Sequence, residues 1–369
     1  MRATKFNLEP IKKFLGNIGH FSNSLSYWKF CLLFTTIFLI KAGFRGIQPW
    51  GDFTPVTNFP KPMKTFSSNS YGLIIISKIL DIKEKNMFFA LNVVLLVVLI
   101  SSLYYLIYKK FDRFTAKLLV LIFVSSPLFI VLSGNIGRHD LLTISGIIGF
   151  LLVTNKFNKT IFLALGCLGS PEHLVAAFFL YYLGVKIYKN YKFKNDAKFA
   201  LIFSSFYTAL SSIWVASQTG GGNRFSNVLF EAGFLKIAIR NFMNNFALEW
   251  YSYFGFYWVT VIIAIVCLNP GLRIKVISLM IVPLLFNLIM VDKTRDFVIA
   301  ILPLAILIHK PLFDFVDFKL KSMNKAAFEF SLGVYIFFIV VFPSIEITFE
   351  GRPRAPFEWA ITKFLETLS

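Results

Sequence analysis

The sequence predicts an all-α protein, a polytopic transmembrane helical bundle of about 9–11 helices. Apolar residues make up 56% of the 369 residues, and phenylalanine alone occupies 45 positions, more than a water-soluble core can hide. Long apolar stretches recur from Phe30 to Pro343. In lipid each stretch must be helical, because a helix satisfies its own backbone hydrogen bonds.

The apolar stretches define the expected domain organisation. The expected spans cover residues 30–43, 87–108, 117–134, 141–154, 161–170, 174–185, 199–216, 251–268, 276–291, 297–309 and 328–343. Residues 1–29 are basic and no small-residue cleavage pattern follows them, so we expect an uncleaved cytoplasmic N-terminus and no signal peptide. Residues 30–343 then form a single multi-pass domain, residues 344–369 form an extracytoplasmic tail, and no soluble catalytic domain is expected. The expected location is a bacterial cytoplasmic membrane, with the N-terminus inside.

One region leaves the number of spans open. Residues 160–185 can form one long helix, or two short helices separated at Gly169-Ser170-Pro171-Glu172-His173. With two helices, the loops on the side of the N-terminus hold more Lys and Arg than the opposite loops, as expected of cytoplasmic loops. With one helix these residues divide almost evenly. We therefore predict two helices.

Two long outer loops, residues 44–86 and 217–250, are each expected to contain an amphipathic helix. In the first loop the helix is the segment from Tyr71 to Leu80. In the second loop the residues expected on the membrane surface are Leu229, Phe230, Phe234, Ile237 and Phe242, with Lys236 and Arg240 toward the lipid headgroups.

The formal charge of +19 comes from basic residues scattered between apolar stretches, without a folded basic module. Anionic lipids are therefore expected partners and nucleic acid is not. Cys31, Cys167 and Cys267 all lie in apolar stretches, so we expect neither a disulfide framework nor a cysteine metal site.

Four polar clusters are expected at the same, outer face of the bundle. They are Asp52 in Trp-Gly-Asp-Phe-Thr-Pro, then Arg138-His139-Asp140, Glu172-His173, and Asp292-Lys293-Thr294-Arg295-Asp296. Each lies at the end of an apolar span, where ionisable side chains are costly unless they pair or line a wet cavity. We therefore expect the four clusters to share one site.

Each cluster has a chemical and a structural interpretation. Asp52 can act as a general base or cap a turn. Arg138 and Arg295 can bind phosphate oxygens or form internal ion pairs. The Asp, Glu and His residues carry donor types that suit a divalent cation, but they lack the i, i+4 spacing of helical metal sites. The predicted catalytic residues are Asp52, Asp140 and Glu172, and the predicted donor-binding residues are Arg138, His139, His173, Lys293, Arg295 and Asp296, with no metal ligands assigned.

A basic N-terminus precedes one span and a long outer loop that carries Asp52 in Gly-Asp-Phe-Thr-Pro, the amphipathic segment after it, and many further spans. This layout resembles the membrane-embedded glycosyltransferases of the C superfamily, which use lipid-linked sugars. The resemblance implies that Asp52 is the catalytic base and that Arg138 or Arg295 binds the donor phosphate. Many members carry a paired acid in this loop, whereas Asp52 stands alone.

We therefore expect a glycosyltransferase that moves a sugar from a polyprenyl-phosphate donor to an acceptor at the outer face of the membrane, with Asp52 as general base. Besides a purely structural membrane scaffold, two functional alternatives stay open. One is a polysaccharide polymerase of the O-antigen or capsule type, which acts on lipid-linked oligosaccharides. The other is a transporter or lipid flippase, in which the charged residues line a path.

Overall fold

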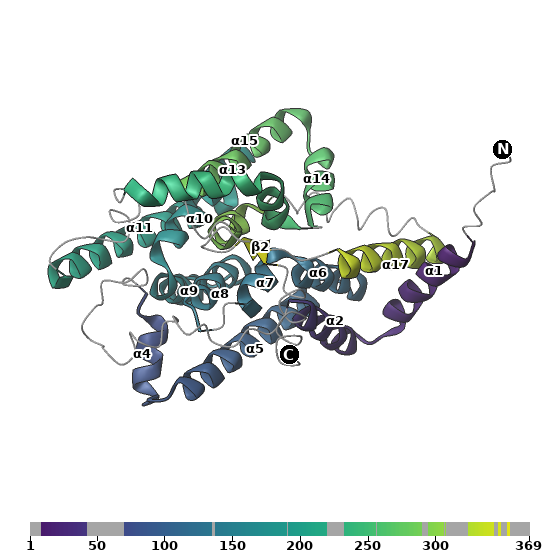
Figure 1. The fold of residues 1–369 in the computed structure, drawn as a ribbon, viewed down its shortest axis with the longest axis horizontal. Helices are drawn as coiled ribbons and strands as arrows, with labels where there is room; N and C mark the ends of the chain where they lie inside the picture. The colour runs from purple at the N-terminus through teal and green to yellow at the C-terminus, as the bar shows by residue number, and fades with distance from the viewer. Residues whose placement is uncertain are drawn as a thin grey trace.

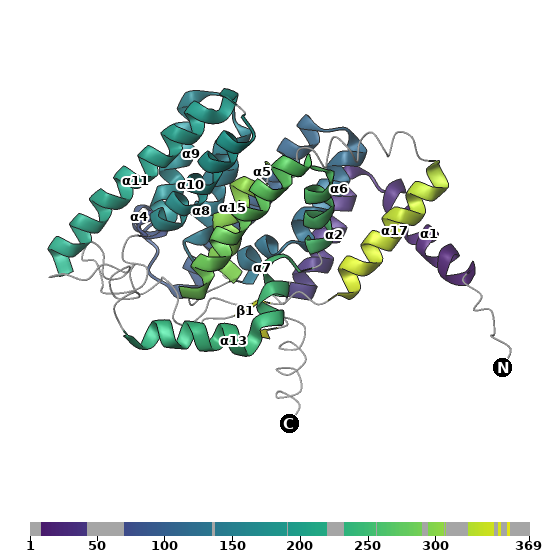
Figure 2. The same ribbon diagram turned by 90° about the horizontal axis from the view of Figure 1, so that it is seen from above.

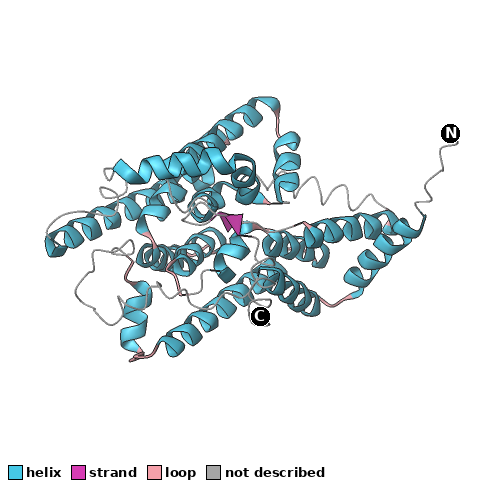
Figure 3. Ribbon diagram, in the orientation of Figure 1, coloured by secondary structure: helices cyan, strands magenta, loops and turns pink. Residues whose placement is uncertain are grey.

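The computed structural model describes residues 9–42, 70–134, 137–189, 191–219, 232–255, 257–289, 294–305, 307, 324–342, 346–347 and 353–354. This part of the chain is all-α apart from one pair of two-residue strands (Figures 1 and 3). The first helices are α1 (Glu9–Ser24), α2 (Tyr27–Ala42), α4 (Gly72–Ile79), α5 (Lys85–Lys110), α6 (Arg113–Ser125), α7 (Pro127–Gly134) and α8 (Asp140–Leu152). The later helices are α9 (Lys156–Gly169), α10 (Pro171–Ile187), α11 (Tyr191–Thr219), α13 (Ala232–Phe254), α14 (Tyr257–Cys267), α15 (Pro270–Ile289), residues 294–305, and α17 (Lys325–Val341).

Within the described ranges, two helical stretches are long and apolar enough to cross a membrane, namely Lys85–Lys109 and Phe193–Ser217. A third crossing results if α6 and α7 are one broken span, because the two helices are bent by 58° at their junction. The span expected over residues 117–134 therefore consists of two helices joined at a bend. Ser126 has an extended backbone and Pro127 cannot donate a helical hydrogen bond, so α6 stops and α7 starts in a new direction.

Residues 160–185 form two helices, as the distribution of basic residues predicts. α9 ends at Gly169, α10 begins at Pro171, and Ser170 between them is extended. Pro171 occupies the first position of α10, where its missing amide hydrogen removes no intrahelical bond. The break therefore follows from local backbone chemistry as well as from charge.

The helices α8 and α9 form a close antiparallel hairpin built on glycine. A Cβ atom on Gly146 would lie 2.4 Å from the Cα atom of Gly166, and one on Gly149 would lie 2.1 Å from the ring of Phe162. Gly169 closes the hairpin, since a Cβ atom there would lie 2.4 Å from the Thr143 hydroxyl. The end of α9 is thereby placed next to the start of α8.

The helix expected in the second outer loop is α13, but it extends to Phe254 and so includes the first residues of the span expected at 251–268. Gly255, with φ of +54°, separates it from α14. Figure 2 shows α13 lying crosswise to α11 and α15 at one end of the bundle. Its described large apolar side chains that are exposed are Ile239, Met243, Phe246 and Leu248, whereas Phe242 is half-buried. Leu229 and Phe230 lie outside the described residues.

The helix expected in the first outer loop is α4, which packs against the α8–α9 hairpin. Leu73 and Ile74 are buried, and a Cβ atom on Gly72 would lie 2.3 Å from the Leu142 side chain. The segment therefore buries its apolar face against protein.

The basic N-terminal segment contains a helix, α1, that packs antiparallel on α17. Gly19 lies against the backbone of Glu329, and Gly333 lies against the backbone of Leu15. His20 Nδ1 is 3.2 Å from the Glu329 carboxylate across the same helix pair. In the expected tail, β1 (Glu346–Ile347) pairs antiparallel with β2 (Pro353–Arg354) and packs against α7 and α13.

Lys117 stabilises the turn between α1 and α2 through hydrogen bonds to its backbone. Its Nζ donates to the backbone oxygens of Ser22, Asn23 and Leu25 at 3.2, 2.8 and 2.7 Å, and the side chain is 3% exposed. We expect Lys117→Met to lower the free energy of unfolding by about 2–3 kcal/mol, because three buried carbonyls lose a charged donor. Denaturant titration of the purified protein measures this.

The control for this substitution is Lys109→Met, which removes an exposed ammonium at the end of α5. We expect that change to stay within about 0.5 kcal/mol of the unaltered protein. Equal losses for the two variants would contradict the structural role of Lys117.

Candidate functional site

Three of the four predicted clusters meet at one end of the bundle. Asp140 begins α8, Glu172 and His173 lie in the first turn of α10, and Arg295 and Asp296 lie in the helical residues 294–305. The helices α8 and α10 thus start at the site. Carboxylates in a first turn are favoured by the positive end of the helix dipole, so these two helix starts suit Asp140 and Glu172.

Arg295 holds two of these clusters together. Its Nη1 lies 3.6 Å from Asp140 Oδ2, and its Nε lies 3.6 Å from Asp296 Oδ1. The three side chains are between 2% and 9% exposed. A guanidinium is the cation that suits such a place, because its planar fork serves two carboxylates and it keeps its charge when buried.

His173 is held between Ser170 and Asp296. Its Nε2 lies 2.7 Å from Asp296 Oδ1 and its Nδ1 lies 2.5 Å from Ser170 Oγ. A neutral imidazole that donates from Nε2 to the carboxylate accepts the Ser170 hydroxyl hydrogen at Nδ1. Ser170 precedes α10 but its hydroxyl does not cap that helix, and its amide donates to Thr143 Oγ1 at 2.7 Å.

Asp140 lies outside the apolar stretch of residues 141–154, and its carboxylate is buried. Burial raises the pKa of Asp140, but the charge of Arg295, with smaller contributions from His139, His173 and Arg138, outweighs this and leaves the pKa below its ordinary value. His139 Nε2 lies 3.8 Å from Asp140 Oδ1. The site therefore holds an ionised carboxylate beside a fixed cation.

The cavity beside Asp140 has a volume of about 10 Å³, enough for one water molecule and not for a sugar phosphate. Asp52, Asp292 and Lys293 lie outside the described residues. Arg138 is half-buried beside Asp140, and Glu172 is half-buried in the first turn of α10. The arrangement can bind an anion at Arg138, move a proton through His173, and orient a carboxylate with Arg295.

Four polar residues of the site were not predicted from the sequence, and three of them carry a weak sequence signal. Ser170 directly precedes the Pro-Glu-His segment, and Thr143 follows His139 by one helical turn. Asn92 is an amide within a long apolar stretch, a placement that is costly in lipid and therefore indicates a buried partner or ligand. Ser252 hydrogen bonds to Thr294 across 2.9 Å and so ties α13 to the helix that carries Arg295.

Within the described ranges, no group of three or more His, Cys, Asp or Glu side chains is placed to hold a metal ion. Comparison of the chain with protein families, with curated proteins and with solved structures found no match.

Proposed function

We propose that the chain is a membrane-embedded glycosyltransferase that moves a sugar from a polyprenyl-phosphate donor to an acceptor at the outer face of the cytoplasmic membrane. One observation carries the proposal: ionisable side chains from three segments far apart in sequence meet at one end of an otherwise apolar bundle. Such side chains are costly beside lipid, and a site for a polar substrate accounts for them. A donor carried by lipid needs no nucleotide-binding motif.

In the proposed reaction, Asp52 removes the proton from the acceptor hydroxyl, which attacks the anomeric carbon while the phosphate departs. Arg138, half-buried beside Asp140, contacts the departing phosphate. Arg295 is already held by two carboxylates, so we assign it to positioning Asp140 and Asp296. Asp140, Glu172 and His173 then line the acceptor side, with His139 adjacent.

Replacement of Asp52 by Asn is expected to lower sugar transfer by roughly 10²- to 10⁴-fold, the usual contribution of a general base. The measurement is the release of polyprenyl phosphate from a radiolabelled polyprenyl-phosphate sugar in membranes that contain the protein. Arg138→Gln should also lower transfer. Arg113→Gln is the matched control, because Arg113 donates to the Leu25 backbone oxygen far along the chain from the site. Undiminished turnover in a well-folded Asp52→Asn protein would contradict the role of Asp52 as general base.

A transporter is the second candidate, and the break between α6 and α7 favours it. Interrupted helices are typical of transporters, where the ends of half-helices contact ions and substrates. Within the described residues, one helix pair that is apolar enough to span a membrane is interrupted in this way, α6 and α7. Substrate uptake into proteoliposomes without release of polyprenyl phosphate would support the transporter over the transferase.

A further inference from the structure

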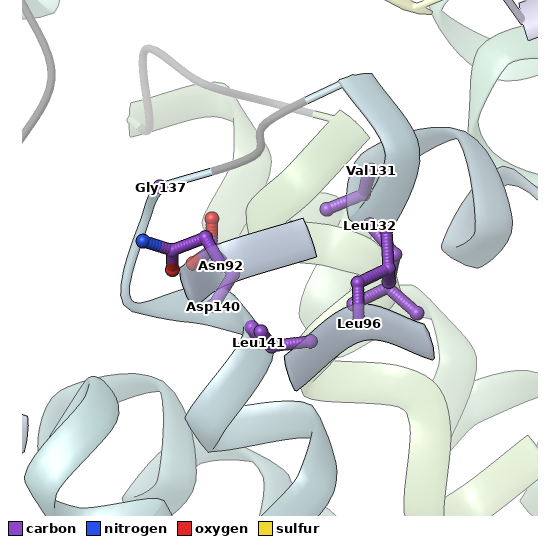
Figure 4. A pocket seen from close by; sticks show the side chains of 7 residues that line it. All are labelled: Asn92, Leu96, Val131, Leu132, Gly137, Asp140 and Leu141. Carbon is purple, nitrogen blue, oxygen red and sulfur yellow. The ribbon is translucent and has the colours of Figure 1, made fainter. Parts of the chain in front are cut away.

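A small cavity separates Asp140 from α5 and from the last turn of α7 (Figure 4). Figure 4 shows the amide of Asn92 and the carboxylate of Asp140 together at this cavity, next to Gly137. The other lining residues are Leu96, Val131, Leu132 and Leu141. Its volume is about 10 Å³, so it accommodates one water molecule or one small ion.

Three side-chain oxygens of the residues that line this cavity have no hydrogen-bond donor within the described part of the chain. Asn92 is 1% exposed, and its Nδ2 donates to the Phe88 backbone oxygen at 2.8 Å. Its Oδ1 has no donor among the described residues. The two carboxylate oxygens of Asp140 likewise have no hydrogen-bond donor there, since Arg295 approaches only to ion-pair distance. Buried oxygens of this kind are normally satisfied by a donor or a cation.

The charge around the cavity also favours a cation. Among the described residues that line the cavity, Asp140 carries the one charged side chain. The last carbonyls of α7 add the negative end of a helix dipole, because the final turn of a helix has no intrahelical partners for them.

We propose that this cavity binds one monovalent cation of the size of Na⁺, held by the Asn92 amide oxygen and the Asp140 carboxylate. A single water molecule has two hydrogens for the three oxygens of the amide and the carboxylate, whereas one cation can contact all three. A divalent ion generally takes more carboxylates than the single one that lines this cavity. The bound ion joins α5 to the start of α8 and lies against the last turn of α7. It therefore fixes Asp140 in the site.

The test compares the thermal unfolding of the purified full-length protein in NaCl and in choline chloride at equal ionic strength. Na⁺ is expected to raise the midpoint temperature by roughly 3 °C or more in a saturable manner, because it binds only the folded protein. KCl is expected to give a smaller increase. Binding of ²²Na⁺ should saturate at about one ion per chain, with Asn92 and Asp140 both required.

Asn92→Leu is expected to abolish the Na⁺-dependent increase and the ²²Na⁺ binding. The matched control is Thr115→Val, which removes a buried hydroxyl of α6 and should leave both intact. Equal midpoints in NaCl and choline chloride, an equal increase in KCl, or an unchanged increase in Asn92→Leu would overturn the proposal and leave a cavity that holds only water. No sugar donor is used, so a negative result is distinct from a failure of the proposed function.

Discussion

Arg295→Met is expected to destabilise the protein by about 3–5 kcal/mol, because it leaves the buried carboxylates of Asp140 and Asp296 without their shared cation. The side chain of methionine has a similar volume, so the loss reports charge more than packing. Arg295→Lys retains the charge but cannot reach both carboxylates with a planar fork, and it should give a smaller loss. Denaturant titration of the purified variants measures the free energy of unfolding.

A double-mutant cycle shows whether the loss comes from the ion pair. If Asp140 and Arg295 are coupled, Asp140→Asn in the Arg295→Met background should cost less than in the unaltered protein, by at least about 1 kcal/mol. Arg240→Met is the matched control, since Arg240 is exposed on α13 and its removal should change stability by no more than about 0.5 kcal/mol. Additive effects at positions 140 and 295 would contradict the pairing.

Gly146→Leu is expected to lower the free energy of unfolding by at least about 3 kcal/mol. Even a Cβ atom at this position would lie 2.4 Å from the Gly166 Cα and 2.7 Å from the Phe162 backbone oxygen, so α8 and α9 must move apart. Separation of this hairpin also moves Asp140 away from Ser170 and His173. Sugar transfer is therefore expected to fall in the protein that remains folded.

Gly16→Ala on α1 provides the control for that substitution, because no atom lies within 4 Å of a Cβ at position 16. Alanine is favoured over glycine in a helix by about 1 kcal/mol, so this variant should be as stable as the unaltered protein or slightly more stable. A comparable loss at both positions would show that the close approach of α8 and α9 does not determine the effect.

The two helix breaks show what local sequence can and cannot predict. The break at Ser170 was predictable, because Pro171 and two ionisable residues stand in an apolar stretch and the distribution of basic residues supports a reversal. The bend at Ser126 was missed, although Pro127 is present there too. Proline is tolerated inside membrane helices when neighbours satisfy the freed backbone groups, so the residue alone does not predict a bend.

The residues of the candidate site were likewise predicted only in part. The sequence predicted that Asp140, His173 and Asp296 would share a site, because each stands at the end of an apolar stretch. It left open whether Arg295 binds a phosphate or an internal carboxylate, and the structure places it between two carboxylates. The involvement of Asn92, Ser170 and Thr143 was not predicted.

By itself the sequence determined that the described chain is helical, that the helix after Lys156 ends before Pro171, and which few ionisable groups need partners. These properties depend on neighbouring residues, on backbone hydrogen bonding and on the cost of placing charge beside lipid. Only the tertiary structure decided that Arg295 joins Asp140 to Asp296 and that Asn92 faces Asp140. Those pairings depend on how closely distant helices pack, and contacts such as Gly146 against Gly166 set that distance.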